Sequence, residues 1–308
     1  MLGLFYKIEK ISSLIPIRKI RSLNWKIIKF FTNFIYKYYV KLYPLKINDK
    51  QKIIDGQVIV SMTTFPDRLP TISLVLESLF RQTIMPDRII LWLAVDQFPD
   101  KCFVESFFKK YINLGLEIGF CDDLRSHKKY YYTMKENPDA YVVTVDDDIL
   151  YAEDMLEKLL KTYILYPNCI ITNRAHEITY DENGDIEAYG KWNWLAKNVK
   201  GPSLNLFATG GAGCLYFPGS LSEHTLDKVA IKKYCLYADD VWLKCMAMLK
   251  KRQIVLSDIN NPEIIDVFDN KDNGLANINV INNKNDEQLK LVSDFYNIDW
   301  RNNNEFNK

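Results

Sequence analysis

Short β-branched runs alternate with segments of helical period between residues 58 and 166, and this alternation constrains the fold more than any other feature. Apolar residues recur at three- and four-residue steps in the helical segments, whereas the strand segments are continuous apolar runs bounded by turn residues. The pattern predicts strands at 58–62, 88–94, 116–120 and 140–145 and helices at 71–82, 128–136 and 152–166. Such alternation predicts an α/β fold, with a mostly parallel sheet covered by helices on both faces and ligands at the carboxyl ends of the strands.

Charge divides the chain into two parts. Residues 1–50 contain eleven Lys or Arg against the acids Glu9 and Asp49, a net charge of +9, so the remainder carries −8. We therefore expect a basic segment, 1–50, followed by one domain, 51–308. That domain should comprise three parts, near 57–150, near 151–260 and a closing segment, 261–308.

The basic segment has the pattern of an amphipathic helix between Pro16 and Pro44. Its apolar residues repeat with helical period, and lysines flank them and interrupt every apolar run well short of a membrane span. No secretion signal is evident. We expect this helix to lie on an anionic membrane, which would place the protein in the cytoplasm at the inner face of the cell membrane. The alternative is a helix packed on the domain itself.

Composition excludes collagen-like, low-complexity and intrinsically disordered proteins. The chain has 308 residues, 48% of them apolar and 26% charged, which is typical of a folded globular protein. Its six cysteines form no C-x-x-C pair, so neither a zinc site nor a dense disulfide framework is indicated. The Asn-rich stretch 260–307 predicts loops and one closing helix near 286–296.

Three consecutive acids, Asp146, Asp147 and Asp148, follow the strand at 140–145. Alternation along an extended chain would place Asp146 and Asp148 on one side and Asp147 on the other. Three adjacent carboxylates repel one another, so a bound Mg²⁺ or Mn²⁺ is the simplest explanation, and an acidic helix cap is the alternative. The chain lacks a P-loop motif, and its acids do not follow the first strand as in haloacid-type phosphatases.

A second constellation lies later in the chain, where the glycine-rich run 207–217 (FATGGAGCLYF) precedes the Ala-Asp-Asp at 238–240. Together with the acidic triplet, in this order, these motifs resemble glycosyltransferases of the GT-A fold. Residues 61–68 (SMTTFPDR) through Asp240 resemble bacterial polysaccharide-locus members. The glycine run and the acid pair resemble the inverting fringe-like and β-1,3-galactosyltransferase-like enzymes.

The resemblance implies a nucleotide-binding half near 57–150, an acceptor half near 151–260 and a donor site. Asp148 and Asp146 would bind the divalent cation that bridges the diphosphate of a nucleotide sugar, with uracil as the expected base. The expected nucleotide-sugar contacts are Thr63, Thr64, Arg68, Lys128, Lys129, Asp146, Asp147, Gly210 and Gly211. No histidine follows Asp240, so a late histidine ligand, frequent in this fold, is absent and carboxylate, phosphate and water would complete the cation's coordination.

The acid pair resembles the position of the general base in inverting enzymes, which nominates Asp240 or Asp239. The expected reaction transfers a hexose or N-acetylhexosamine to a hydroxyl of a surface glycan or lipid-linked saccharide. His176, Trp192 and Trp194 are weaker candidates for contacts with this acceptor, because aromatic rings stack on sugars but also anchor cores.

Two other functions remain open. A sugar nucleotidyltransferase shares strand-end acids but usually has a glycine-rich loop after its first strand, which residues 63–66 lack. A non-enzymatic protein could bind a membrane or nucleic acid through the basic segment. The −8 charge of the remainder argues against a nucleic-acid partner.

Overall fold

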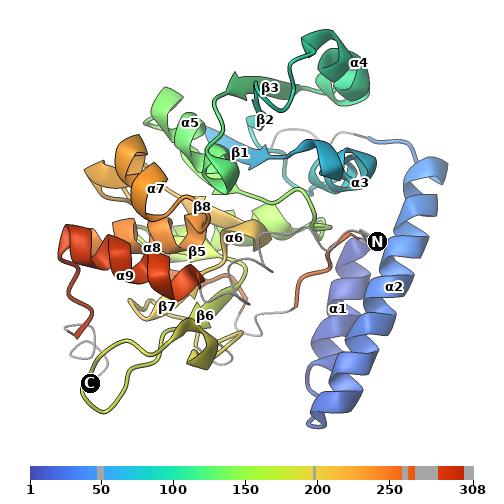
Figure 1. The fold of residues 1–308 in the computed structure, drawn as a ribbon. Coiled ribbons are helices and arrows are strands. Elements are labelled where there is room, and N and C mark those ends of the chain that lie inside the picture. Colours follow the sequence, from blue (N-terminus) through green and yellow to red (C-terminus); the bar gives the residue numbers. More distant parts are fainter. Residues whose placement is uncertain (47–51, 197–198, 259–262, 268–283, 302–308) are drawn as a thin grey trace.

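The computed structural model describes residues 1–46, 52–196, 199–258, 263–267 and 284–301 (Figure 1). A seven-stranded sheet lies at the centre, in the order β3-β2-β1-β4-β8-β5-β9. Its strands are β1 (Val58–Thr63), β2 (Arg88–Ala94), β3 (Leu116–Cys121), β4 (Tyr141–Thr144), β5 (Ile170–Thr172), β8 (Cys214–Tyr216) and β9 (Ile254–Leu256). A separate pair joins β6 (Ala175–Glu177) to β7 (Leu206–Ala208).

Strand directions decide which residues meet at the functional edge of the sheet. Strands β1, β2, β3 and β4 pair in parallel, β8 is antiparallel to both of its neighbours, β4 and β5, and β5 is parallel to β9. Therefore β8 alone runs against the other six. Because β8 is reversed, the residues that precede it lie at the same edge as the residues that follow β1 and β4.

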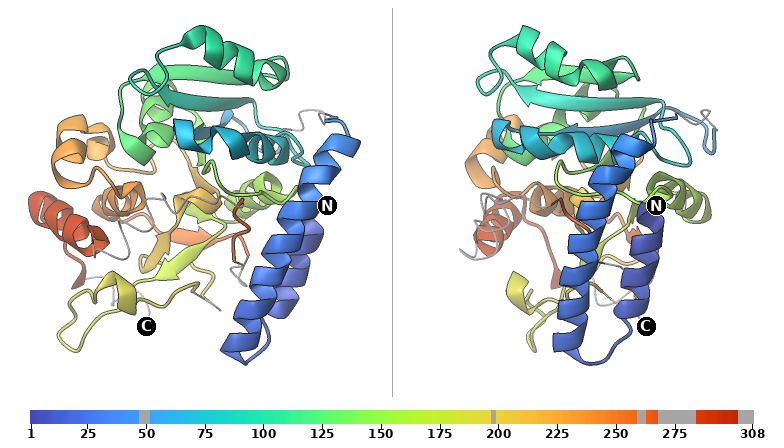
Figure 2. Two further views of the ribbon diagram at one scale, coloured as in Figure 1. Left: turned by 45° about the vertical axis from the view of Figure 1, so that its right-hand side comes forward. Right: turned by 90° about the vertical axis from the view of Figure 1, so that its right-hand side faces the viewer.

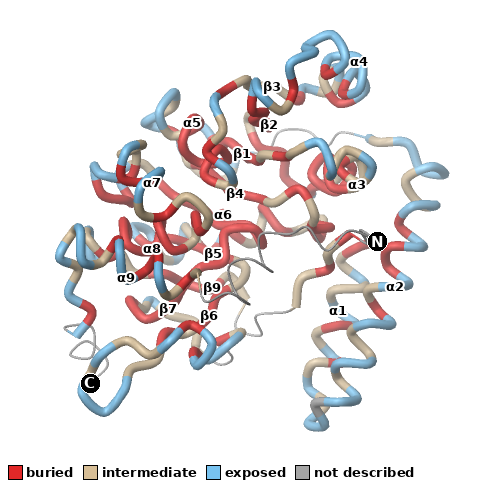
Figure 3. The backbone as a smooth tube through the Cα atoms, viewed as in Figure 1, coloured by how far each residue is buried: buried red, intermediate tan, exposed pale blue. Residues whose placement is uncertain are grey.

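Helices cover both faces of the sheet, as the alternation predicts (Figures 1 and 2). Along β1, Val58, Val60 and Met62 belong to one core cluster and Ile59 to the other, so successive residues enter opposite faces. The first cluster includes helices α3 (Leu69–Leu79), α4 (Lys101–Ile112) and α6 (Met155–Leu165). The second includes α5 (Lys128–Glu136), α7 (Lys228–Tyr234), α8 (Asp239–Leu249) and α9 (Lys284–Tyr296). Figure 3 shows the sheet as the most buried part of the chain.

The basic N-terminal segment forms two helices, α1 (Leu2–Ser12) and α2 (Arg18–Leu42), which lie side by side on one flank of the molecule (Figure 2). The helix expected between Pro16 and Pro44 is confirmed, and α1 is an additional helix upstream of it. No helix in the described ranges is long and apolar enough to cross a bilayer.

The predicted α/β class and mostly parallel sheet are confirmed. Most element limits agree within a few residues, although the helix predicted from residue 152 begins at Met155. Around Asn183-Gly184, a sequence typical of a tight hairpin turn, an isolated antiparallel bridge joins Tyr180 and Ile186. The closing helix lies at Lys284–Tyr296, whereas most of the Asn-rich stretch predicted as loops lies outside the described residues.

Candidate functional site

The candidate site lies between β1 and β4, where the strand order changes direction. From β1 the chain builds outward through β2 and β3 and then returns to place β4 on the other side of β1. In open α/β sheets, ligands bind at such a switch point, outside the carboxyl ends of the strands. The segment after β1, the acids after β4 and the glycine run before β8 all lie at this edge.

The acids after β4 form a tight turn. The strand ends at Thr144 and the turn begins at Asp147. The three acids nevertheless alternate, as expected, in how far their side chains are exposed. The side chains of Asp146 and Asp148 are 38% and 32% exposed, whereas Asp147 is buried. Burial, with the neighbouring Asp148, raises the pKa of Asp147 to about 7. Burial, with Asp146, raises the pKa of Asp148 to about 6. The turn therefore holds more negative charge than its surroundings neutralise.

The segment after β1 supplies partners for two of these acids. Arg68 ends a short 3-10 turn, Pro66–Arg68, and its Nη2 lies 3.0 Å from Asp148 Oδ2. The buried Thr64 hydroxyl donates a hydrogen bond to Asp147. Thr63 does not join the cluster, because its Oγ1 donates to the carbonyl of Trp92 over 2.8 Å. Of the three residues expected here, Arg68 and Thr64 face the acids and Thr63 faces β2.

Lys129 connects the acidic turn to the Asp239-Asp240 pair. Its Nζ, on the first turn of α5, lies 2.6 Å from Asp146 Oδ1 and 2.9 Å from Asp239 Oδ2. The lysine is 3% exposed, and although burial opposes its charge, Asp146 and Asp239 raise its pKa well above the usual value. Lys128 instead pairs with Asp123 over 2.7 Å. The sequence left Lys128 and Lys129 equivalent, and only Lys129 belongs to the acid cluster.

The glycine run lies between the two groups of acids. Gly210–Ala212 form a short 3-10 turn before β8, and Gly210 N–H donates to Asp240 Oδ1 over 2.9 Å. A β-carbon at Gly211 would lie 1.9 Å from Asp146 Oδ2, and one at Gly210 would lie 2.9 Å from Asp240 Oδ1. Glycine is thus required at Gly211 because the backbone passes directly against a site carboxylate.

The two acids of the pair differ in environment although they adjoin each other at the start of α8. Asp239 is buried, and burial acts to raise its pKa, but the Lys129 ammonium and weaker contacts outweigh burial and lower it. Asp240 is partly exposed, and burial together with Asp239 raises its pKa to about 7. Asp239 is therefore held as a carboxylate, whereas Asp240 can exchange a proton near neutral pH.

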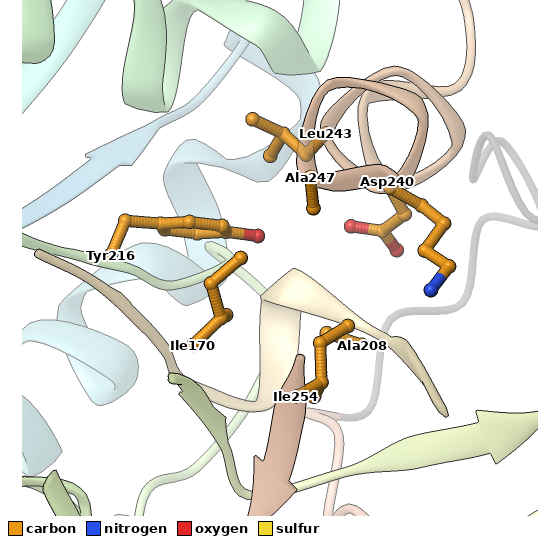
Figure 4. Close-up of a pocket in the computed structure, with 8 residues that line it drawn as sticks. Ile170, Ala208, Tyr216, Asp240, Leu243, Ala247 and Ile254 are labelled. Carbon is orange, nitrogen blue, oxygen red and sulfur yellow. The ribbon is translucent and has the colours of Figure 1, made fainter. Parts of the chain in front are cut away.

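A cavity of about 10 Å³ lies beside Asp240, and apolar side chains, Tyr216 and Lys244 line much of it (Figure 4). The Tyr216 hydroxyl points towards the Asp240 side chain. A space of this size holds at most about one water molecule. A ligand larger than a water molecule therefore cannot reach Asp240 through this cavity.

The three weaker acceptor candidates lie together but differ in access. His176 is buried, its Nδ1 accepts a hydrogen bond from Leu195 N–H, and burial lowers its pKa to about 3. Trp192 is 3% exposed and packs on Phe207, so its role is that of a core residue. Trp194 is 43% exposed and lies over His176, with ring centroids 4.6 Å apart. Of the three, Trp194 alone offers an accessible ring face.

Two residues that sequence reasoning did not nominate also belong to the site. Tyr151 donates from its hydroxyl to the Gly211 carbonyl and accepts from Asp146 N–H over 2.7 Å, joining the acidic turn to the glycine run. Arg174 contacts Thr209 Oγ1 over 3.3 Å, while its buried Nε has no hydrogen-bond partner. Arg174 follows directly after β5 (Ile170–Thr172), and residues directly after a strand of the sheet are where ligand contacts are expected.

The acids suit a hard divalent cation if the substrate supplies most of the ligands. In the described part of the chain, no three His, Cys, Asp or Glu side chains converge on one point. The accessible oxygens of Asp148 and Asp146 are nevertheless the ligand type that Mg²⁺ and Mn²⁺ prefer, and Mg²⁺ commonly takes one or two carboxylates plus phosphate and water. The raised pKa values of Asp147 and Asp148 are consistent with a turn that would gain stability from a bound cation.

The architecture and the site define an α/β protein with an acid-lined switch point. No protein-family model and no curated protein matches the chain. Solved structures with distant similarity include the mannosyltransferase PcManGT from Pyrobaculum calidifontis in complex with GDP-Man and Mn²⁺, with 12% identity, coverage of 94% of this chain and 76% of that one, and a TM-score of 0.48. They also include S. aureus TarS 1-349 in complex with UDP-GlcNAc, with 13% identity, coverage of 71% and 60%, and a TM-score of 0.45.

A third similar structure is a 4-diphosphocytidyl-2C-methyl-D-erythritol synthase, with 12% identity, coverage of 74% of this chain and 99% of that one, and a TM-score of 0.41. At these identities and TM-scores the similarities do not assign a family. The functional argument therefore rests on the chain's own residues.

Proposed function

We propose that this protein is a metal-dependent inverting glycosyltransferase that moves a hexose or N-acetylhexosamine from a nucleotide sugar, a UDP-sugar by sequence resemblance, to a saccharide hydroxyl. The observation that carries the proposal is the arrangement of two groups of acids on either side of Gly210-Gly211. One group, with Arg68, suits a diphosphate and its cation, and the other contains a carboxylate that can accept a proton.

The donor half of the site consists of Arg68, Asp148, Asp146 and Lys129. When bound by Asp148 and Asp146, Mn²⁺ or Mg²⁺ would supply positive charge to the diphosphate. Arg68 is placed to exchange its contact with Asp148 for a phosphate oxygen, since a guanidinium suits phosphate geometry. Lys129 keeps Asp146 oriented and adds a second positive charge at the same edge.

The acceptor half uses Asp240 as general base. Its carboxylate takes the proton of the acceptor hydroxyl as that oxygen bonds to the anomeric carbon. The bond from this carbon to the diphosphate oxygen breaks on the opposite face, and the electron pair leaves with the diphosphate. Gly210 N–H holds Asp240 Oδ1, which leaves Oδ2 for the proton. Asp239 serves as a positioning residue because its charge is already paired with Lys129.

The first experiment measures thermal unfolding with UDP, GDP and CMP, each with Mn²⁺ and with EDTA. A ligand at a hundredfold excess over Kd stabilises the native state by about 2.7 kcal/mol, so a nucleotide that binds through the cation raises the melting temperature only when Mn²⁺ is present. The Asp148→Asn variant should lose this shift. Equal shifts with Mn²⁺ and EDTA, or no shift with any nucleotide, would contradict the proposed donor site.

A further inference from the structure

The α1–α2 pair presents an apolar face to solvent. On α2, Leu23, Ile27, Phe30, Phe31, Phe34 and Tyr38 are between 44% and 59% exposed. These positions lie within about one third of the helix circumference, because residues three and four apart share a face. On α1, Leu4 and Ile8 are 60% and 42% exposed. Contiguous apolar surface of this extent marks an interaction site.

The domain does not cover this apolar face, because it packs against the opposite side of α2. Tyr36 and Thr32 are fully buried, and the buried Asn33 donates to the carbonyl of Asp266 over 3.0 Å. Lys29 forms an ion pair with the carboxylate of Asp266. The domain thus occupies one side of the helix and leaves the apolar side outward, which excludes packing on the domain as an account of the stripe.

The charge around the face identifies what it contacts. The whole of α2 contains no Asp or Glu. Lys19, Lys26 and Lys37 are exposed, and at about 100° per residue they cluster along one border of the apolar face. A second copy docked on this face would bring its own basic helix against this one. An anionic lipid surface instead accepts both the apolar side chains and the lysines, whose stems can extend to the headgroups.

We propose that α1 and α2 lie flat on an anionic membrane, with the aromatic and aliphatic stripe in the headgroup region and the lysines at the lipid phosphates. The orientation of the domain then follows from its contacts with the two helices. Tyr6 of α1 donates to the carbonyl of Leu150 over 2.8 Å, and the Met1 ammonium pairs with Glu153. Both partners lie within a few residues of the acidic turn, so these contacts link the proposed membrane surface to the candidate donor site.

The test is co-sedimentation of the full chain with vesicles of phosphatidylcholine alone or mixed with phosphatidylglycerol. We expect binding to the anionic vesicles that weakens as salt rises. The Lys19→Gln/Lys26→Gln/Lys37→Gln variant should bind them roughly a hundredfold more weakly, from the usual contribution of each basic residue near an anionic surface. The Phe30→Ser/Phe34→Ser variant should lose sedimentation.

The matched control is Ile164→Ser/Leu165→Ser, which removes exposed apolar side chains of α6, 52% and 71% exposed, outside the proposed surface. It should bind as the unmodified chain does, and all variants should keep the same melting temperature. Unchanged vesicle binding by the Phe30→Ser/Phe34→Ser variant overturns the proposal. So does absence of vesicle binding together with a dimer that this variant dissociates, since the face would then join two copies.

Discussion

At the scale of single residues, the site separates two adjacent carboxylates into different roles. Lys129 pairs with Asp239 and holds it as an anion, whereas burial and the neighbouring Asp239 raise the pKa of Asp240 to about 7. The sequence Ala-Asp-Asp does not distinguish the two acids. The distinction arises because α8 places Asp239 towards α5 and Asp240 towards the glycine run.

Replacing Asp240 with Asn should lower turnover by about 10²- to 10⁴-fold while leaving nucleotide binding intact, because the amide cannot accept the proton. For the unmodified protein we expect the proposed reaction to slow as pH drops below about 7, where Asp240 becomes protonated. Steady-state kinetics across pH, with a nucleotide-dependent melting shift as the binding control, check both expectations. A normal rate for the Asp240→Asn variant would show that another group is the base.

Gly211→Ala should weaken the Mn²⁺-dependent nucleotide shift, because the added methyl lies 1.9 Å from Asp146 Oδ2 and must displace that carboxylate or the turn. Gly190→Ala is the matched control, since a β-carbon there meets nothing within 4 Å. The melting shift with nucleotide and Mn²⁺ measures the difference. Equal shifts for the two variants would mean that the close packing at Gly211 has no bearing on binding.

At the scale of elements, helix α1 and the segment 263–267 form hydrogen bonds with the acidic turn and the residue Leu150 that follows it. The hydroxyl of Tyr6 donates to Leu150 O and accepts from Ile265 N–H over 3.2 Å, while Val267 N–H donates to Asp148 O over 2.6 Å. These bonds connect α1, the segment 263–267 and the acidic turn. Local sequence patterns do not predict these hydrogen bonds, because the residues that they join are more than a hundred positions apart.

Tyr6→Phe should lower the free energy of unfolding by about 1–3 kcal/mol, because it leaves two backbone groups without their partner. Tyr38→Phe is a suitable control, as its side chain lies on the exposed face of α2. Denaturant unfolding of both variants provides the comparison. Equal stability would indicate that water replaces the Tyr6 hydroxyl.

At the scale of the whole molecule, stability depends on a charged group inside the core. Lys244 on α8 is 3% exposed and donates to the carbonyl of Leu204, and burial lowers its pKa to about 7. The unfolded chain therefore holds the proton more tightly between about pH 7 and the usual lysine value of 10.5. Over that window the lysine makes the free energy of unfolding rise with pH. The destabilisation caused by burying its charge is fully present below pH 7.

Lys244→Met should accordingly raise the free energy of unfolding, most of all at or below pH 7, and remove this part of the pH dependence. A thioether of similar length fills the same space without a charge to bury. Melting temperatures of the variant and the unmodified chain from pH 6 to pH 10 measure the change. A constant difference across that range would show that Lys244 does not titrate in the folded protein.

The sequence alone determined the features that depend on local periodicity and local chemistry. Strand and helix alternation, the acids at the end of a strand, the glycine run and the basic amphipathic helix are all readable because hydrophobic period and residue type act over a few neighbours. They were enough to predict the α/β class and to bring Asp148, Asp240 and Arg68 into consideration.

Only the tertiary structure decided which of these residues meet and which faces remain open. The reversed β8 brings the glycine run to the acid edge, α5 points Lys129 and not Lys128 at the acids, and packing turns Thr63 and Trp192 away. Likewise, α2 has apolar residues on both sides, and the contacts with Asp266 determine which side faces outward. These outcomes depend on contacts between residues far apart in the chain, which local periodicity does not encode.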